Sequence, residues 1–268
     1  MRKHAFYTYA LLLFSFLLFS QAEAPAPPKE LRVIRHQAFK QGEFLEYRIH
    51  YGIINAGRAE LQVKSVDTRN GRKVFHMVGT GRSVGMAEVF FRTRDRYETW
   101  IDAEAIVPWE FVRDVDEGGF IIKRHLHFDH FAATVRDKEL KSDTVFAIPE
   151  NIQDMLSAFY YARTLDATQL KKGDMIPISM FLDHEVFSFQ LKYLGKEDVK
   201  SKFGKIRCLK FMPIVQSGRV FKEKEGMTLW VSDDLNKVPI RLETELAVGS
   251  IKIDLSDYRN VAQPMSFR

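Results

Sequence analysis

The chain has 268 residues, of which 46% are hydrophobic, with one cysteine and a net charge of +5 at pH 7. Its length permits one large domain, and the single Cys208 excludes an internal disulfide. The small positive excess is spread over both halves of the sequence and is not the charge pattern of a nucleic-acid-binding protein.

The N-terminal residues 1–22 have the layout of a cleaved secretory signal peptide. Basic residues at positions 2–4 precede an apolar run over positions 10–19, and this run is shorter than the roughly 20 residues of a membrane-spanning helix. We expect cleavage after Ala22, which lowers the net charge from +5 to +3 by removing two basic residues. Residues 23–36 then form a Pro-rich spacer, and the mature protein lies in the periplasm without a transmembrane segment.

Residues 37–268 are predicted to form a single β-rich domain. Apolar and polar residues alternate in many short runs, beginning with Phe44–Tyr51. Asn70-Gly71 is a strong signal for a two-residue hairpin turn. Further turn sequences fall at 117–119, 172–174, 217–218 and 232–234. Because short consecutive strands joined by tight turns pair antiparallel, we expect a curved antiparallel sheet of half-barrel or barrel-like form.

One segment departs from this alternation and is predicted to be an amphipathic helix at about 151–166. Its apolar residues recur with helical spacing: Ile152, Met155, Leu156, Phe159 and Tyr160. Asn151 suits the N-cap, with Asp154 three residues later. Met155, Phe159 and Tyr160 are candidates for lining an apolar ligand pocket, although such a stripe more often belongs to the core.

A G-x-S-x-G motif at 81–85 raises the question of a hydrolase nucleophile at Ser83. That motif works at a sharp turn between a strand and a helix. The segment after Ser83 alternates as a strand over 88–101. We therefore expect Ser83 to lie in a turn between strands, and we predict no catalytic residues.

A second candidate site is the sequence HLHFDH at 125–130. On a strand, His125, His127 and Asp129 share one face, where two imidazoles and a carboxylate could bind zinc with one open position and help from a distant residue such as His184. The competing interpretation is the solvated face of an amphipathic strand, since an isolated H-x-H often arises by chance. We favour that interpretation and predict no cofactor.

A third candidate is the series Arg92, Arg94 and Arg96, which would project three guanidinium groups from one face of a strand. Guanidinium groups suit phosphate, sulfate and carboxylate. The series therefore indicates either contact with an anionic ligand group or a solvated face neutralised by neighbouring carboxylates.

The segments 42–61, 107–119, 128–130, 149–165 and 229–243 together resemble the bacterial family named domain of unknown function 3108. The helix sequence QDMLSAFYYAR is the most specific part of this resemblance, which spans nearly all of the mature chain. The resemblance implies an exported envelope protein of curved-sheet or half-barrel form, similar to capsule-gene lipoproteins and more loosely to lipoprotein carriers. It brings no established active site, and the signal carries no cysteine for lipidation.

These observations predict a non-enzymatic periplasmic protein that binds an apolar or amphipathic ligand: a lipid, a lipid-linked glycan or a lipoprotein segment. A curved antiparallel sheet leaves an apolar concavity, which the 22 Phe and 9 Met residues would line. Two alternatives remain. One is a structural protein that contacts partners in envelope polysaccharide or surface assembly, and the other is a metal-assisted hydrolase built on His125, His127 and Asp129.

Overall fold

The computed structural model describes residues 30–215 and 226–268. Residues from Leu31 onward form one compact unit. The predicted signal peptide, most of the spacer and the turn at 217–218 lie outside the described residues. The last residues of the predicted spacer lie against the domain, where Arg32 Nε donates to the Ala105 carbonyl at 2.8 Å.

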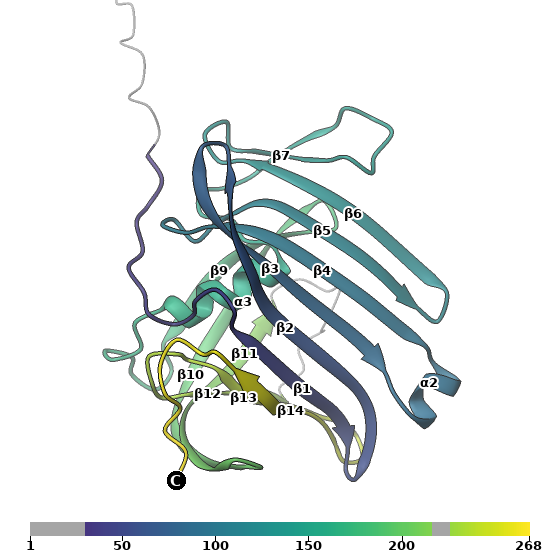
Figure 1. Ribbon diagram of the computed structural model, residues 1–268, viewed down its shortest axis with the longest axis vertical. Coiled ribbons are helices and arrows are strands. Elements are labelled where there is room, and N and C mark those ends of the chain that lie inside the picture. The colour runs from purple at the N-terminus through teal and green to yellow at the C-terminus, as the bar shows by residue number, and fades with distance from the viewer. Residues whose placement is uncertain (1–29, 216–225) are drawn as a thin grey trace, which may run out of the picture. The chain divides into compact units, whose positions relative to one another are not determined.

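Within the described residues, fourteen strands form one sheet, and each strand is antiparallel to its neighbours (Figure 1). In chain order the strands are β1 (Phe44–Tyr51), β2 (Ile54–Arg69), β3 (Arg72–Ser83), β4 (Thr93–Asp102), β5 (Pro108–Glu117), β6 (Phe120–Asp129), β7 (Thr134–Asp137), β8 (Val145–Ala147), β9 (Met175–Leu182), β10 (Glu185–Ser201), β11 (Gly204–Val215), β12 (Met227–Ser232), β13 (Pro239–Glu245) and β14 (Ser250–Arg259). The helices are α2 (Met86–Phe90) and α3 (Met155–Thr164).

The sheet consists of two meanders that join at the pair β1–β14. Strands β1 to β8 follow one another in sequence, and strands β14 to β9 continue the sheet in reverse order. The sheet therefore has two free edges, β8 and β9, and the chain between these edges carries α3. The predicted fold class, a barrel-like antiparallel sheet with an amphipathic helix, is confirmed. The sheet does not close into a barrel.

Side chains bring the two free edges together. The rings of Phe146 on β8 and Phe181 on β9 lie 5.6 Å apart, and His184 stacks on Phe146 at 4.9 Å. His184 Nε2 also lies 2.8 Å from a carboxylate oxygen of Asp137 on β7. Aromatic and polar contacts thus take the place of a backbone ladder between β8 and β9.

Helix α3 packs into the concave side of the sheet and links its two halves. Leu156 and Tyr160 belong to a core cluster with residues of β2 to β9. Ala158, on another side of the helix, belongs to a cluster with residues of β9 to β12. A further cluster joins β1 and β14 to β10–β13 and includes the buried Cys208, so Cys208 serves as a small buried hydrophobic residue.

The helix begins at Met155, later than predicted, and its N-cap is Asp154 in place of Asn151. The Asp154 carboxylate accepts hydrogen bonds from the amides of Leu156 and Ser157, both at 2.7 Å, and the Ser157 hydroxyl accepts one from the Asp154 amide at 2.8 Å. The later start follows from β9, because Gln153 exchanges backbone hydrogen bonds with it and stays extended.

The segment after Ser83 also differs from the prediction. Residues Met86–Phe90 form the short helix α2, where an uninterrupted strand was expected. Ser83 is the last residue of β3 and is buried, and its hydroxyl accepts a hydrogen bond from the Thr93 amide at 2.9 Å. Among the described residues, no hydrogen bond joins this hydroxyl to a histidine.

Exposed apolar side chains gather at one end of the sheet, on four neighbouring connections. These connections are β13–β14, β1–β2, β3–β4 with α2, and β5–β6 (Figure 1). The most exposed apolar side chains at these tips are Ile53 (94%), Phe90 (81%), Val89 (77%), Val248 (77%), Met86 (65%) and Phe120 (65%). Apolar surface is thus concentrated at the hairpin tips. Among the described residues, no helix is long and apolar enough to cross a membrane.

Candidate functional site

An apolar cavity of about 220 Å³ lies between one side of α3 and strands β9 to β12. The residues that line it come from α3, the segment after α3, strands β9 to β12, the β12–β13 connection and the start of β13. They are Met155, Ala158, Phe159, Ala162, Arg163, Leu165, Ala167, Leu170, Ile176, Met180, Phe189, Leu191, Leu209, Phe211, Leu229, Val231, Lys237 and Pro239.

The strands form one wall of the cavity because alternate side chains along a strand point to the same face and the register aligns them across neighbouring strands. Leu209 pairs directly with Val231, and Phe211 pairs with Leu229, so these four side chains point to the same face of the sheet. Small residues of α3, such as Ala162, face these strands. Because Ala158 and Ala162 contribute little side-chain volume, space remains between this part of the helix and the sheet.

An ion pair anchors the end of α3 beside the cavity. Arg163 is 2% exposed and Glu43 is fully buried; Nη1 of Arg163 lies 2.5 Å from one carboxylate oxygen and Nη2 lies 2.8 Å from the other. Nη2 also donates to the Ala38 carbonyl at 2.7 Å, and Nε donates to the Asn236 carbonyl at 3.0 Å. The charge of Arg163 is therefore neutralised within the protein.

Lys237 is the other cation that lines the cavity, and in the described part of the chain it forms no ion pair. Its side chain is half-buried, and burial lowers the pKa of its ammonium group from the ordinary value. Asp166, Asp234 and Asp233 attract this ammonium group electrostatically but form no ion pair with it among the described residues. The ammonium group can therefore still donate a hydrogen bond to the acidic group of a ligand.

The candidate residues of the helix and of the arginine series occupy different places. Met155 and Phe159 line the cavity, whereas Tyr160 is fully buried in the core cluster beneath β2 to β9. Arg94 pairs with Glu88. Arg96 pairs with Glu98 at 2.7 Å.

Arg92 lies outside β4, in the connection from α2. None of the three arginines of this series lines the cavity.

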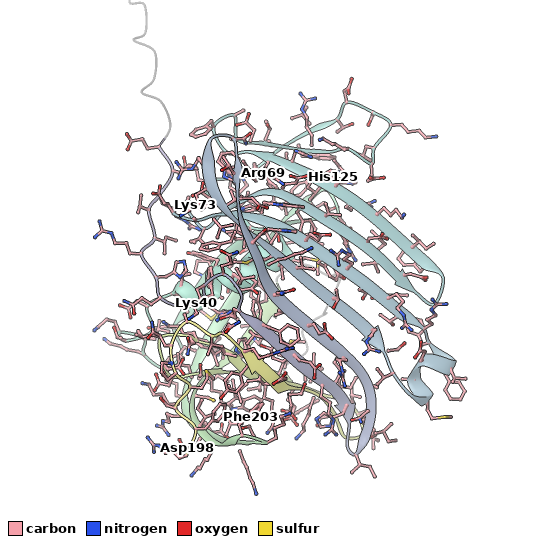
Figure 2. All side chains as sticks on the ribbon, in the orientation of Figure 1. Lys40, Arg69, Lys73, His125, Asp198 and Phe203 are labelled. Atoms are coloured by element: carbon pink, nitrogen blue, oxygen red, sulfur yellow. The ribbon has the colours of Figure 1, made fainter. Side chains whose placement is uncertain are left out.

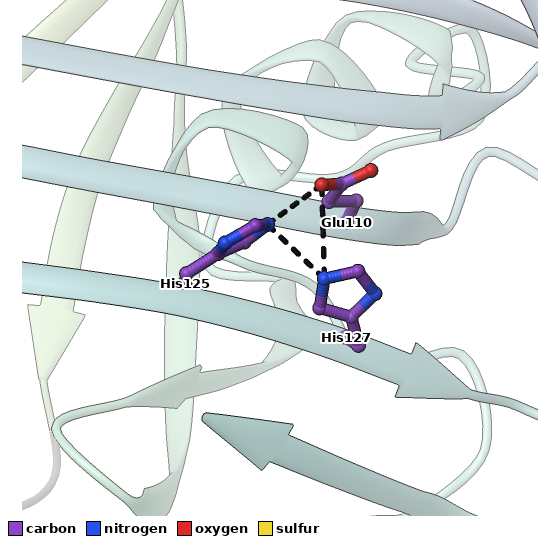
Figure 3. Close-up of side chains that lie close together, drawn as sticks. All are labelled: Glu110, His125 and His127. Atoms are coloured by element: carbon purple, nitrogen blue, oxygen red, sulfur yellow. Dashed lines mark hydrogen bonds and ion pairs between the residues drawn. The ribbon is translucent and has the colours of Figure 1, made fainter. Parts of the chain in front are cut away.

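On the face of the sheet opposite to α3, the candidate metal ligands His125 and His127 lie beside a third residue, Glu110 (Figure 3). His125 Nε2 lies 2.6 Å from Oε1 of Glu110 and 3.0 Å from Nε2 of His127. His127 Nε2 lies 3.7 Å from the same oxygen of Glu110. Asp129 lies outside this cluster, where its carboxylate accepts hydrogen bonds from the amides of Phe131 and Ala132.

Sequence analysis missed Glu110 because this residue lies on a different strand from the two histidines. The position of the β5–β6 turn could nevertheless have identified it. The β5–β6 hairpin pairs Glu117 with Phe120 across Gly118-Gly119, and the same register places Glu110 directly opposite His127. Since directly paired residues share a face, the predicted turn and the histidine positions together select Glu110.

The surroundings of the cluster hold its carboxylate in the ionised form. Burial alone would raise the pKa of Glu110, but hydrogen bonds from His125 and Arg69 keep it below the ordinary value. Nε of Arg69 donates to the second carboxylate oxygen at 3.2 Å, and Figure 2 labels Arg69 and His125 in this part of the sheet. Burial also lowers the pKa of His127, which favours its neutral imidazole. His184 lies elsewhere, bonded to Asp137.

The family description "Protein of unknown function (DUF3108)" matches residues 46–256, which span nearly the whole sheet. The chain belongs to the DUF3108 family. The match extends from β1 to β14 and includes the cavity, α3 and the histidine cluster. No curated protein sequence matches this DUF3108 chain.

One solved structure shares the fold of this DUF3108 protein at low sequence identity. A "beta-barrel-like protein" of the family DUF1849 from Brucella abortus is 9% identical, with a TM-score of 0.52 over 86% of this chain and 99% of that chain. A DUF1089 family protein from Pseudomonas aeruginosa is 13% identical, with a TM-score of 0.38 over 69% of this chain and 88% of that chain. The first of these similarities establishes a barrel-like fold, and a shared fold alone does not determine function.

Proposed function

We propose that this protein binds an apolar or amphipathic ligand in the cavity beneath α3 and acts, without catalysis, as a carrier or chaperone-like protein of the bacterial cell envelope. The cavity itself is the main support. Its volume is about 220 Å³, whereas an engineered apolar protein cavity of about 150 Å³ already binds benzene. The cavity is therefore large enough for a segment of an acyl chain.

The charges around the cavity favour a ligand with an acidic end. Arg163 is fully paired with Glu43, but Lys237 at the wall forms no ion pair in the described residues. A carboxylate or phosphate beside Lys237 would gain a charge-assisted hydrogen bond while the chain of the ligand is buried. This combination fits a fatty acid or another single-chain lipid.

The proposed location outside the cytoplasm rests on the N-terminal sequence. Residues 1–22 have the basic head and apolar middle of a signal peptide. A lipid-sized ligand would accompany a protein of this kind through an aqueous compartment such as the periplasm. Native mass spectrometry of protein purified from a bacterial periplasm without detergent should then detect a lipid-sized adduct.

Fluorescence titration with 11-dansylaminoundecanoic acid tests the binding site directly. Ala162→Trp fills the cavity from α3, so we expect it to weaken probe binding at least about tenfold, equivalent to about 1.4 kcal/mol. Ala132→Trp, which adds the same side chain at an exposed position, should leave the affinity unchanged. Lys237→Gln should weaken binding of the acid more than binding of its methyl ester.

Either of two results would contradict this binding function. The wild-type protein would fail to bind the probe, or Ala162→Trp would bind it as tightly as the wild type does. A protein purified without any lipid that also fails to bind the probe would support a role through protein partners. The apolar hairpin tips would then be the first surface to alter.

A further inference from the structure

We propose that Glu110, His125 and His127 form a binding site for a divalent transition-metal ion of the zinc type, with one coordination position open to solvent. This site lies on the face of the sheet opposite to α3, and it is independent of the ligand cavity. Sequence alone suggested the two histidines with Asp129, and the strand register replaces Asp129 with Glu110.

The separations among the three donor atoms match the geometry of a tetrahedral site. With metal–ligand bonds of 2.0–2.1 Å, two ligand atoms of a tetrahedral zinc ion lie about 3.3 Å apart. The three pairs here lie at 2.6, 3.0 and 3.7 Å, which bracket that value. Small rotations of the side chains would therefore place all three atoms at bonding distance from one ion.

Proton positions give a second, independent argument. Nε2 of His125 faces both the Glu110 carboxylate and Nε2 of His127. A single hydrogen on this nitrogen can be directed well at only one of them, and two protonated Nε2 atoms at 3.0 Å would repel each other. A metal ion resolves the conflict, because it accepts a lone pair from each imidazole and from the carboxylate at once.

The neighbouring residues would support metal binding in the expected way. Arg69 holds the second oxygen of Glu110 at 3.2 Å and lies over the ring of Trp100 at 5.0 Å, so the carboxylate has a fixed orientation. The side chains of His125 and His127 are 30% and 35% exposed. An ion would therefore be reachable from solvent and would carry a water molecule in its fourth position.

Isothermal titration of the full chain with ZnCl₂ tests this site, with protein purified without a histidine tag. We expect one Zn²⁺ per chain. His127→Ala and Glu110→Gln should each weaken binding at least about 100-fold, because the loss of a second-shell partner alone costs 10–100-fold. Co²⁺ should give the strong visible absorption of a four-coordinate site in the wild type only.

His50→Ala is a matched control. His50 also contacts a carboxylate, with Nε2 2.9 Å from Asp254, and it lies on β1, which pairs with β2 and β14 and not with β5 or β6. Among the described residues no second imidazole bonds to it, so its removal should leave Zn²⁺ affinity unchanged. The proposal is overturned if the wild type binds no Zn²⁺, or if His127→Ala and Glu110→Gln bind Zn²⁺ like the wild type. Circular dichroism of each variant separates lost ligands from lost folding.

Discussion

Asp154 shows how one buried carboxyl group links helix capping to pH. It is fully buried and accepts hydrogen bonds from two amides of α3 and from the Thr99 hydroxyl, the last at 2.6 Å. Burial outweighs these hydrogen bonds and raises the pKa of Asp154 to about 6, above the value of about 3.9 in an unfolded chain. The folded state therefore holds this proton more tightly than the unfolded state does.

The stability that Asp154 contributes as a protonated group is fully present below pH 4 and is lost as the pH rises through about 6. Asp154→Asn keeps a good N-cap but does not titrate. Between pH 4 and pH 7, we expect the free energy of unfolding of the wild type to fall by about 2 kcal/mol relative to the variant. Urea unfolding at several pH values measures this difference, and parallel pH curves for the two proteins would contradict the raised pKa. Burial also raises the pKa of Asp95 to about 6. Because Asp95 is present in both proteins, its effect cancels when their unfolding free energies are compared.

The β2–β3 hairpin is an element whose local sequence determines its shape. Asn70 and Gly71 have φ angles of 50° and 72°, as a two-residue turn with both residues in the left-handed region requires. A methyl group at Gly71 would meet no atom within 4 Å. Gly71→Ala should therefore destabilise the protein through backbone strain alone, by about 1 kcal/mol.

The urea midpoint of Gly71→Ala measures that cost. Asn70→Gly is the matched control, because glycine adopts the same φ without strain, and it should change stability by only a few tenths of a kcal/mol. Equal stability of Gly71→Ala and the wild type would show that this turn can adopt another conformation.

Local sequence signals predicted some of the turns and helices correctly but did not predict others. The β2–β3 and β5–β6 turns were predictable because Asn-Gly and Gly-Gly favour left-handed backbone. The start of α3 was not, because Gln153 is held extended by β9, a contact that local sequence does not reveal. Helix α2 has five residues, too few for a helical period to stand out from strand alternation. Predicting Glu110 required the pairing register of β5 and β6, which the pattern within a single strand does not contain.

For the whole molecule, the question is whether the two meanders unfold together. The core clusters share partners: Leu61 packs against the first and second, and Tyr161 against the first and third. The Arg163–Glu43 ion pair also ties α3 to the chain just before β1. We therefore expect one cooperative unfolding transition.

The three tryptophans allow a test, because Trp100 and Trp109 lie in the first meander and Trp230 lies in the second. In Trp230→Phe, fluorescence reports on the first meander, and in the double variant Trp100→Phe/Trp109→Phe it reports on the second. In each variant the fluorescence midpoint in urea should coincide with the far-UV circular dichroism midpoint of the same protein. A midpoint that separates in either variant would indicate independent unfolding of one half.

The β1–β14 pair also determines the order in which the sheet can be assembled during synthesis. Strands β2 to β8 can each pair with the strand made just before them, but the second edge of β1 has no partner until residues 250–259 have been made. An unpaired edge can recruit strands from other chains. The nascent chain therefore carries an aggregation-prone edge from the synthesis of β1 until that of β14, and a ribosome that stalls before β14 would release a chain that still exposes this edge.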